Sequence, residues 1–361
     1  MIVVKSDWFT HGVTGNGVCG MRYVFRKVNY FLQVLNYIFR TLAGNFKPLN
    51  ADGAITKERD LLASENVLLR EELRRALMPT GYYPEVSNAA VTKGLCELVN
   101  PNRYLDREWM DIHLQLERYS IDKHCFSNRS GAIYRKGWEW THCVYGLKKL
   151  GMLNPSYKAI GVGAGREPVI FYLAEHISSV MATDLYGEQG WTSTGGQEAD
   201  LTLVEECKKI CPPTVDFSKI TFESQNGAAL TYEDNSFDFA WSLSSIEHFG
   251  GHSAASQAIR EMARVIRPGG VIAVATEMLL LEEHAHPEFF TKKQIEEYLI
   301  NPFSGTLELV DEINYDTLSY EYLLDSISLP QGVHRRRRHV VLNDGEVQWT
   351  SIMLFYRKKH P

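Results

Sequence analysis

Short apolar runs alternate with amphipathic segments after Asn154, and this alternation constrains the fold more than any other feature of the sequence. Helical spacing of apolar residues marks 166–176 and 253–267. The runs that have the length and composition of buried strands are 157–163, 178–184, 219–225, 237–243 and 269–277. Strands that alternate with helices predict βαβ units and a parallel sheet.

The C-terminal part of the chain offers two more strands, within 307–317 and 346–358, without a full helix between them. Two strands in that arrangement favour an antiparallel hairpin at one side of the sheet. We therefore expect an α/β fold with a seven-stranded sheet that is mostly parallel and carries an antiparallel C-terminal hairpin.

A turn almost without side chains follows the first strand, in the stretch AIGVGAGREP, where glycines stand at 161, 163 and 165. In an open parallel sheet, ligands bind beyond the carboxyl ends of the strands, where such a turn lets backbone come close to them. A nicotinamide fingerprint needs a glycine at the sixth position of G-x-G-x-x-G, but Arg166 or Pro168 stands there. The chain also lacks the phosphate-binding motif of nucleotide hydrolases.

Several later segments keep the order and separation found in one family. Asp184 ends the second strand, and the segments at 226–251 and 261–276 read NGAALTYEDNSFDFAWSLSSIEHFGG and EMARVIRPGGVIAVAT. With the G-x-G-x-G turn, the stretch 157–276 resembles the class I S-adenosylmethionine-dependent methyltransferases of the type 11 kind. The resemblance implies a Rossmann-like methyltransferase sheet with S-adenosylmethionine as cofactor. The residues of these motifs also resemble those of a bacterial subset of the family that is linked to surface-glycan biosynthesis.

The same resemblance assigns residues to the cofactor. It implies that Asp184 binds the ribose hydroxyls, and that Glu167 meets the methionine ammonium in place of the acidic residue that Ala159 replaces. The alternative for Glu167 is a residue of the first helical turn that complements the helix dipole. The other positions that the resemblance assigns to cofactor binding are Gly161, Gly163 and Gly165 in the turn, Asn226, through its amide oxygen, and Gly227 near the adenine, and Ser242 and Leu243 at the methionine end.

Methyl transfer to a hydroxyl benefits from a base, and His248 lies just past the fourth strand, where the acceptor is expected. A structural histidine that caps the loop is the alternative. Its neighbour Glu247 is expected to orient it, to bind the cofactor or to pair with an arginine. We expect transfer to an oxygen of a sugar, glycan or other small polar acceptor. The alternatives are a non-catalytic cofactor-binding or scaffold protein and an oxidoreductase with an atypical dinucleotide turn.

The N-terminal segments carry different signals. Residues 1–50 hold six Lys and Arg against Asp7 alone, with an amphipathic stretch within 28–44 that fits either a membrane surface or packing on protein. Residues 57–77, within the segment 51–80, fit a short coiled coil that forms a homodimer, or a lone solvated helix. We expect a helical cap at 81–153 and the methyltransferase domain at 154–361.

Net charge and cysteine content limit the classes of partner and the cellular setting that we expect. A net charge of −6 over 361 residues argues against a chain that binds nucleic acid with its whole surface. Six cysteines make no disulfide framework and favour a cytoplasmic setting. Neither Cys207 with Cys211 nor His284 with His286 predicts a metal site. The basic run 334–339, HRRRRH, fits either a site that attracts an anionic acceptor or a solvated loop.

Overall fold

The structure is a computed structural model, and it describes residues 94–100, 103–104, 106–126, 134–186, 199–315, 340–343 and 347–361. The contacts divide the chain into two units, Met1–Glu85 and Val86–Pro361. The predicted segments 1–50 and 51–80, the coiled coil at 57–77 and the basic run at 334–339 lie outside the described residues. All of the features that follow belong to the second unit.

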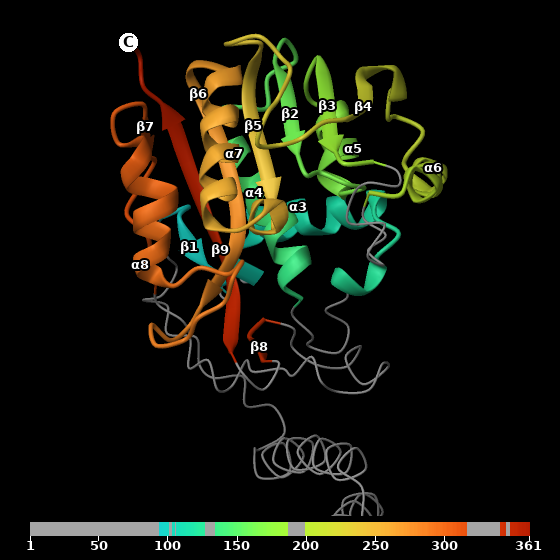
Figure 1. Cartoon of the computed structure of the whole chain (residues 1–361). Helices are drawn as coiled ribbons and strands as arrows, with labels where there is room; N and C mark the ends of the chain where they lie inside the picture. Colours follow the sequence, from blue (N-terminus) through green and yellow to red (C-terminus); the bar gives the residue numbers. More distant parts are fainter. Residues whose placement is uncertain are drawn as a thin grey trace, which may run out of the picture. The chain divides into compact units, whose positions relative to one another are not determined.

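One mixed sheet forms the centre of this unit (Figure 1). Its strands lie in the order β1-β9-β6-β5-β2-β3-β4, and β7 and β8 also pair with β9. The strands are β1 (Glu97–Leu98), β2 (Lys158–Val162), β3 (Ser179–Asp184), β4 (Ile220–Ser224), β5 (Phe237–Leu243), β6 (Ile266–Leu279), β7 (Leu307–Leu309), β8 (Leu342–Asn343) and β9 (Gln348–Lys358).

The predicted architecture is confirmed. Strands β2 to β6 pair in parallel, and β9 pairs antiparallel with both β6 and β7. The structure adds β1 and β8, which pair with the outer edge of β9 at Ile352–Met353 and Gln348–Trp349. Each has only two residues, which is too short for an alternating pattern to show in the sequence.

Helices cover both faces of the sheet (Figure 1). The α-helices are α3 (Arg107–Leu116), α4 (Arg135–Lys149), α5 (Pro168–Ala174), α6 (Leu201–Ile210), α7 (His252–Val265) and α8 (Lys292–Gln294). One π-helix, η8 (Ile295–Ile300), is described. The described 3₁₀ helices are η3 (Glu117–Tyr119), η4 (Lys123–Cys125), η6 (Phe217–Lys219), η7 (Ile246–Phe249) and η9 (Asn301–Phe303).

Alternate residues of the strands enter two separate hydrophobic clusters. Along β6, Val271 and Ala273 belong to the cluster that includes α3, α4 and α5, whereas Ile272 and Val274 belong to the cluster that includes α7. Side chains that alternate along a strand point to opposite faces of the sheet, so each central strand packs against both helical layers.

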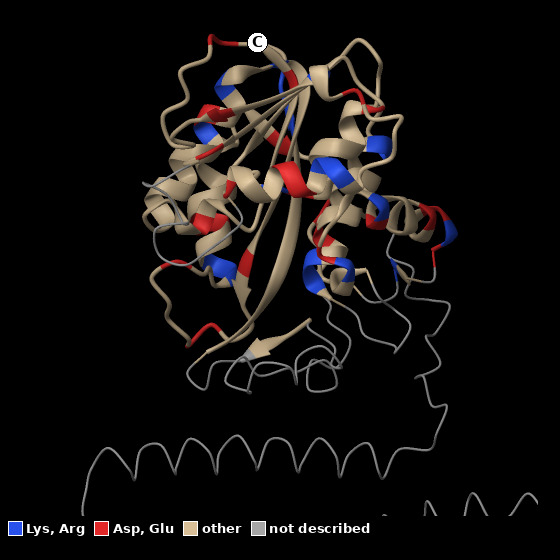
Figure 2. Ribbon diagram, turned by 90° about the vertical axis from the view of Figure 1, so that its right-hand side faces the viewer, with Lys and Arg blue, Asp and Glu red and all other residues tan. Residues whose placement is uncertain are grey.

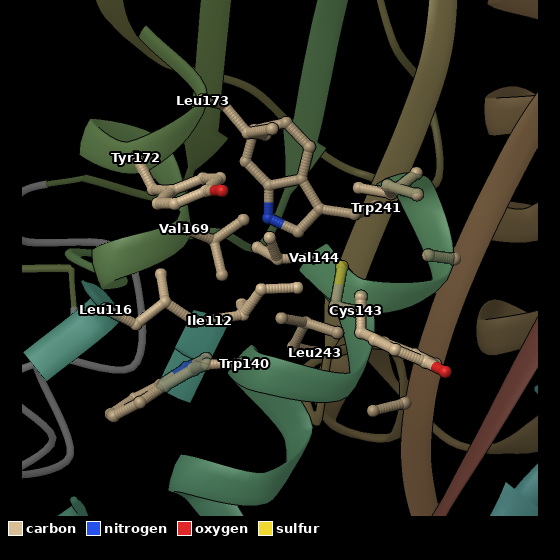
Figure 3. Packing of buried hydrophobic residues seen from close by; sticks show 14 of the residues in the cluster. Ile112, Leu116, Trp140, Cys143, Val144, Val169, Tyr172, Leu173, Trp241 and Leu243 are labelled. Atoms are coloured by element: carbon tan, nitrogen blue, oxygen red, sulfur yellow. The ribbon is translucent and has the colours of Figure 1, made fainter. Parts of the chain in front are cut away.

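The first of these clusters joins α3, α4 and α5 to β5 (Figure 3). Ile112 from α3, Val144 from α4 and Val169 from α5 lie around the indole of Trp241 from β5 (Figure 3). All four side chains are fully or almost fully buried. Burial of this kind stabilises the layer by roughly 1.5–3 kcal/mol for each large side chain.

Helix α4 lies directly on the sheet, although it comes from the segment predicted as a cap. A Cβ added at Gly146 would lie 2.1 Å from Cζ of Phe355 in β9, so the ring occupies the place of a side chain at 146. The cap at 81–153 stays a prediction as a boundary, and α4 within it forms part of the layer that covers β9 and β6.

Local signals place the ends of some helices. Asp106 begins α3, and its side chain accepts from the backbone N–H groups of Glu108 and Trp109. Thr291 is the N-cap residue of α8 and forms a reciprocal capping box with Gln294. Acidic and basic residues are mixed over the described helices and loops (Figure 2). No helix in the described ranges has the length and apolarity needed to cross a membrane.

Substitution of Gly146 by alanine tests the contact between α4 and β9. Alanine is the better helix former by about 1 kcal/mol, but its methyl group overlaps the Phe355 ring. We expect Gly146→Ala to lower the free energy of unfolding by roughly 1–3 kcal/mol, measured by urea denaturation. Gly305→Ala is the control, because nothing lies within 4 Å of a Cβ there. Equal stability of the two variants would contradict this packing.

Candidate functional site

The glycine turn between β2 and α5 depends on backbone angles that favour glycine. Gly163 and Gly165 have φ values of +67° and +49°. Residues with side chains rarely adopt these angles, so the second and third glycines of the motif are needed for the turn itself. The turn ends at Glu167, the N-cap residue of α5, and Pro168 follows at the first helical position.

Asp184 reaches this turn from the neighbouring strand. The parallel pairing of Val162 with Thr183 brings the ends of β2 and β3 together. The Oδ2 atom of Asp184 accepts from the N–H of Gly165 at 3.0 Å, and Oδ1 accepts from the N–H of Leu185 at 2.7 Å. The predicted ribose-binding carboxylate therefore lies directly against the predicted glycine turn.

The first glycine of the motif has a different task. A Cβ at Gly161 would lie 2.4 Å from Cζ2 of Trp241, so the absent side chain makes room for the indole. The Nε1 atom of Trp241 donates to Oε2 of Glu167 at 3.0 Å. The Glu167 carboxyl makes no capping bond to α5, and burial raises its pKa well above the ordinary value. Sequence reasoning missed Trp241, and the only available signal was its position in the alternating run of β5.

Arg166 is a large charged residue directly after the glycines of the turn, and its side chain forms an ion pair with another segment. Its guanidinium pairs with Asp122, which follows η3, at 2.5 Å. The pair connects the turn to the segment after α3, which explains how a bulky cation fits next to three glycines.

Asn226 and Gly227 follow β4 at the same edge of the sheet. The Oδ1 atom of Asn226 accepts from the N–H of Ala228 at 3.0 Å, so this oxygen, which the adenine prediction uses, also closes a local turn. A Cβ at Gly227 would lie 2.4 Å from Cε2 of Phe249 and 2.7 Å from Cγ1 of Val162. Phe249, which sequence reasoning did not select, therefore lies next to both Gly227 and Gly163.

The exit of β5 is fixed to the glycine turn by hydroxyl groups. Ser242 donates to the carbonyl of Val162 at 2.6 Å, and Ser245 donates to the carbonyl of Gly163 at 2.7 Å. The carbonyl of Leu243 accepts from Nζ of Lys136 in α4 at 3.5 Å. The Leu243 side chain is buried, which leaves only its backbone for the predicted contact.

The predicted catalytic neighbours His248 and Glu247 have different partners. Nδ1 of His248 lies 3.1 Å from Oε2 of Glu288, and the His248 side chain is 25% exposed. Glu247 is buried, and its Oε2 accepts from Thr276 in β6 at 3.0 Å. The expectation that Glu247 orients His248 is therefore corrected: Glu288 has that position. It lies forty residues further along the chain, where no local pattern could identify it.

A buried group of charges from three elements surrounds Glu247. We call it the α4 charge cluster: Arg135, Lys136 and Glu139 from α4, Glu247 from η7 and Glu277 from β6. Arg135 pairs with Glu139 at 3.1 Å and with Glu277 at 2.5 Å. Lys136 pairs with Glu139 at 3.1 Å. Four of the five residues are buried, and Lys136 is partly exposed.

The carboxyl groups of this cluster differ in how they are satisfied. Glu139 also accepts from Ser244 and Ser351, and although burial opposes its ionisation, Lys136 and Arg135 hold its pKa below the ordinary value. Glu247 lacks such partners. Burial, and then the nearby carboxylate of Glu277, raise the pKa of Glu247 to about 8. Its Oε1 has no hydrogen-bond partner in the part of the chain that the structure describes.

These carboxylates do not form a metal site. Over the described ranges, no group of three or more His, Cys, Asp or Glu residues is placed to hold a metal ion. The site therefore combines a bare turn, a ribose-side carboxylate and a charged network at the carboxyl ends of β2, β3, β5 and β6. It can hold a polar ligand against backbone and place a carboxyl or imidazole group beside it.

Comparison with known proteins supports the predicted chemistry. Residues 160–274 match the family model of a methyltransferase domain. The chain is 28% identical over 154 residues to the O-methyltransferase resE of Aspergillus sclerotiorum, which is 42% of this chain and 54% of that protein. It is 33% identical over 115 residues to the ubiquinone/menaquinone biosynthesis C-methyltransferase UbiE of Hahella chejuensis, 30% of this chain and 39% of that protein. These findings support a methyltransferase with S-adenosylmethionine as cofactor.

Other similarities are shorter or lie in the fold alone. The chain is 37% identical over 62 residues to the 27-O-demethylrifamycin SV methyltransferase of Amycolatopsis mediterranei, 17% of this chain and 22% of that protein. It thus spans about half of the curated relative resE and less of the other two. A solved structure of a putative sarcosine dimethylglycine methyltransferase from Galdieria sulphuraria has a TM-score of 0.41 and 15% identity, over 61% of this chain and 85% of that one.

Gly163→Ala tests the glycine turn. The substitution places a side chain at φ +67°, with its Cβ 2.6 Å from Cβ of Ser245, and we expect binding of S-adenosylmethionine to be lost while the circular dichroism spectrum is retained. Gly151→Ala is the matched control, because Gly151 has φ +77° and open space around it. Both variants pay about 1–2 kcal/mol of backbone strain. Unchanged affinity of Gly163→Ala in calorimetry would show that the turn does not hold the ligand.

Glu247→Gln tests the buried carboxyl. A carboxyl whose pKa is about 8 in the folded chain and ordinary in the unfolded chain makes the folded state less stable as pH rises from about 5 to about 8. We expect Glu247→Gln to gain roughly 1–3 kcal/mol of unfolding free energy over the natural chain between pH 5 and pH 8, measured by urea denaturation. The exposed Glu205→Gln should gain nothing. A gain that is the same at both pH values would contradict the raised pKa.

Proposed function

We propose that this protein transfers a methyl group from S-adenosylmethionine to an oxygen of a small polar acceptor, with sugars and glycans as the first candidates. One observation carries the proposal: within the matched methyltransferase domain, the carboxylate of Asp184 accepts a hydrogen bond from Gly165 inside the G-x-G-x-G turn. A carboxylate held against bare backbone at the carboxyl ends of parallel strands is suited to ribose hydroxyls.

The residues of the site fit this cofactor. Gly163 and Gly165 bring no side chains into the turn, and Asp184 offers its carboxylate beside them. Glu167 presents a carboxyl group in the same turn for an ammonium group, while Leu243 and Lys136 lie at the exit of β5. The cofactor supplies a methyl group on a positively charged sulfur, a leaving group that needs little help from the protein.

The chain's own contribution is alignment and the removal of a proton. The serine hydroxyls at the exit of β5 hold it against the glycine turn, which keeps the two sides of the site in register. Two groups at this edge can accept a hydroxyl proton. One is His248: Glu288 contacts its Nδ1 atom, and Nε2 is the ring nitrogen that would accept the proton. The other is the buried carboxyl of Glu247.

Support for an oxygen acceptor comes from the relatives. Two of them are named for O-methylation, and one is named a C-methyltransferase. The glycan class of acceptor is supported by the resemblance of the sequence motifs alone. A cytoplasmic location, contact of residues 1–50 with a membrane surface and a homodimer through 57–77 belong to the same proposal, as predictions from the sequence.

Cofactor binding and turnover test the proposal together. We expect the full chain to bind S-adenosylmethionine in calorimetry and to release S-adenosylhomocysteine with acceptors from a panel of nucleotide sugars and glycan fragments. Asp184→Asn should weaken cofactor binding by about 1–3 kcal/mol because hydroxyl groups lose a charged partner. Asp216→Asn, which changes an exposed N-cap residue of η6, is the control.

Three outcomes count against parts of this proposal. A chain that does not bind S-adenosylmethionine contradicts the function as a whole. Binding without turnover on any acceptor favours the non-catalytic alternative. An Asp184→Asn variant that binds as tightly as the Asp216→Asn control would place the ribose elsewhere.

A further inference from the structure

Carboxyl groups outnumber cations around Lys136. The α4 charge cluster contains Glu139, Glu247 and Glu277, and Glu167 in the glycine turn lies within reach of the same charges. Among the residues that the structure describes, the cations paired with these four carboxyl groups are Arg135 and Lys136. If every group were ionised, the six residues would carry two negative charges in a buried place, which is costly without a further cation.

Both cations are already engaged with other carboxylates. Arg135 pairs with Glu139 and Glu277, and Lys136 pairs with Glu139. Glu247 is left with one hydrogen bond from Thr276, while its Oε1 has none from any described residue and its side chain is 0% exposed. The site thus contains a buried carboxyl group whose ionised form lacks a hydrogen-bonded cation among the described residues, so that a positive charge nearby would stabilise it.

This surplus lies at the end of the site where the reaction is expected. Lys136 reaches the carbonyl of Leu243 at the exit of β5, and Glu167 belongs to the glycine turn. Ser245 joins these two segments through its bond to Gly163. Under the proposed function, on which this inference rests, the sulfur of the methyl donor lies between them.

We propose that the carboxyl surplus of these six residues recognises the positive charge on the sulfur of S-adenosylmethionine, so that the site prefers the donor over its demethylated product and releases a proton when the donor binds. S-Adenosylhomocysteine has the same adenosine, ammonium and carboxylate groups but an uncharged sulfur. The difference between the two ligands is therefore the one charge that this surplus can detect.

The charged and titratable neighbours of Glu247 and Glu167 come from several elements. Those that face Glu247 are Glu277 from β6 and Lys136 and Arg135 from α4. Those that face Glu167 are Lys136, Glu139 and Cys143 from α4, Asp184 from β3 and Tyr186 after it. Only Lys136 and Arg135 in these sets are cations.

The direction of the pH effect follows from these surroundings. Burial, and then Glu277, raise the pKa of Glu247 to about 8, so this carboxyl group holds a proton near neutral pH in the free chain. A fixed positive charge nearby favours the ionised form and lowers the pKa. Donor binding therefore releases a proton, and donor affinity rises with pH until the Glu247 carboxyl of the free chain is itself ionised, above pH 8.

Calorimetry on the full chain with the two ligands tests this inference. Titrations with S-adenosylmethionine and S-adenosylhomocysteine are run from pH 6 to pH 9, each in two buffers of different ionisation enthalpy. We expect protons to be released with the donor and not with the product. The ratio of product Kd to donor Kd should rise with pH by about tenfold for each unit by which the donor lowers the carboxyl pKa.

A matched pair of variants assigns the effect to the cluster. Glu247→Gln should reduce the proton release and flatten the pH dependence of the ratio, whereas Glu205→Gln, a 62% exposed residue of α6, should behave as the natural chain. Glu277→Gln removes the carboxylate that raises the pKa of Glu247, so it gives a second measurement in the same direction if Glu247→Gln does not fold.

The outcomes separate this inference from the proposed function. A ratio that is constant from pH 6 to pH 9, or an unchanged pH dependence in both cluster variants, overturns the inference while leaving cofactor binding intact. A chain that binds neither ligand at any pH overturns the proposed function and the inference with it.

Discussion

The indole of Trp241 occupies the space that a side chain at position 161 would need, and the site is built around that contact. The ring packs among α3, α4 and α5 on one side of the sheet (Figure 3), and its Nε1 donates to Glu167 in the glycine turn. One residue therefore joins the hydrophobic core to the predicted cofactor turn. The first glycine of the motif serves this packing, while the second and third provide the backbone angles of the turn.

Helix α4 makes the site larger than the matched domain. The family match covers 160–274, but α4 precedes it and contributes Arg135, Lys136 and Glu139 to the charged cluster. The helix is fixed by the contact of Gly146 with Phe355 in β9, which also lies outside the match. The part of the site beside the exit of β5 thus depends on segments that lie before and after the matched domain. Unlike the glycine turn, these segments carry no recognisable motif.

Features with a local pattern could be predicted from the sequence, and features that depend on long-range pairing could not. The strands β2 to β6 and the glycine turn follow from apolar runs and glycine spacing, and Asp184 follows from its place at the end of a strand. The pairing of His248 with Glu288 joins residues forty positions apart. Orienting His248 was one of three roles expected for Glu247, which accepts from Thr276 instead. Asn226 was selected for an oxygen that the structure shows in a local turn. The partners of Arg135 in β6 and β9 become visible only when the sheet is assembled.

The proposed charge recognition also gives the reaction a consistent proton balance. Under this proposal, binding of the donor would release a proton from the carboxyl surplus and leave a buried carboxylate at this end of the site. In the transfer, the bound cofactor would supply the methyl group and keep the electron pair of the broken carbon–sulfur bond, while His248 or Glu247 would take the hydroxyl proton of the acceptor. The positive charge that favoured ionisation of Glu247 disappears in the same step, so the pKa of that carboxyl rises again. The carboxyl group that lost a proton on donor binding would then regain one. The product carries no charge on sulfur, so the carboxyl groups of the site would no longer favour its binding.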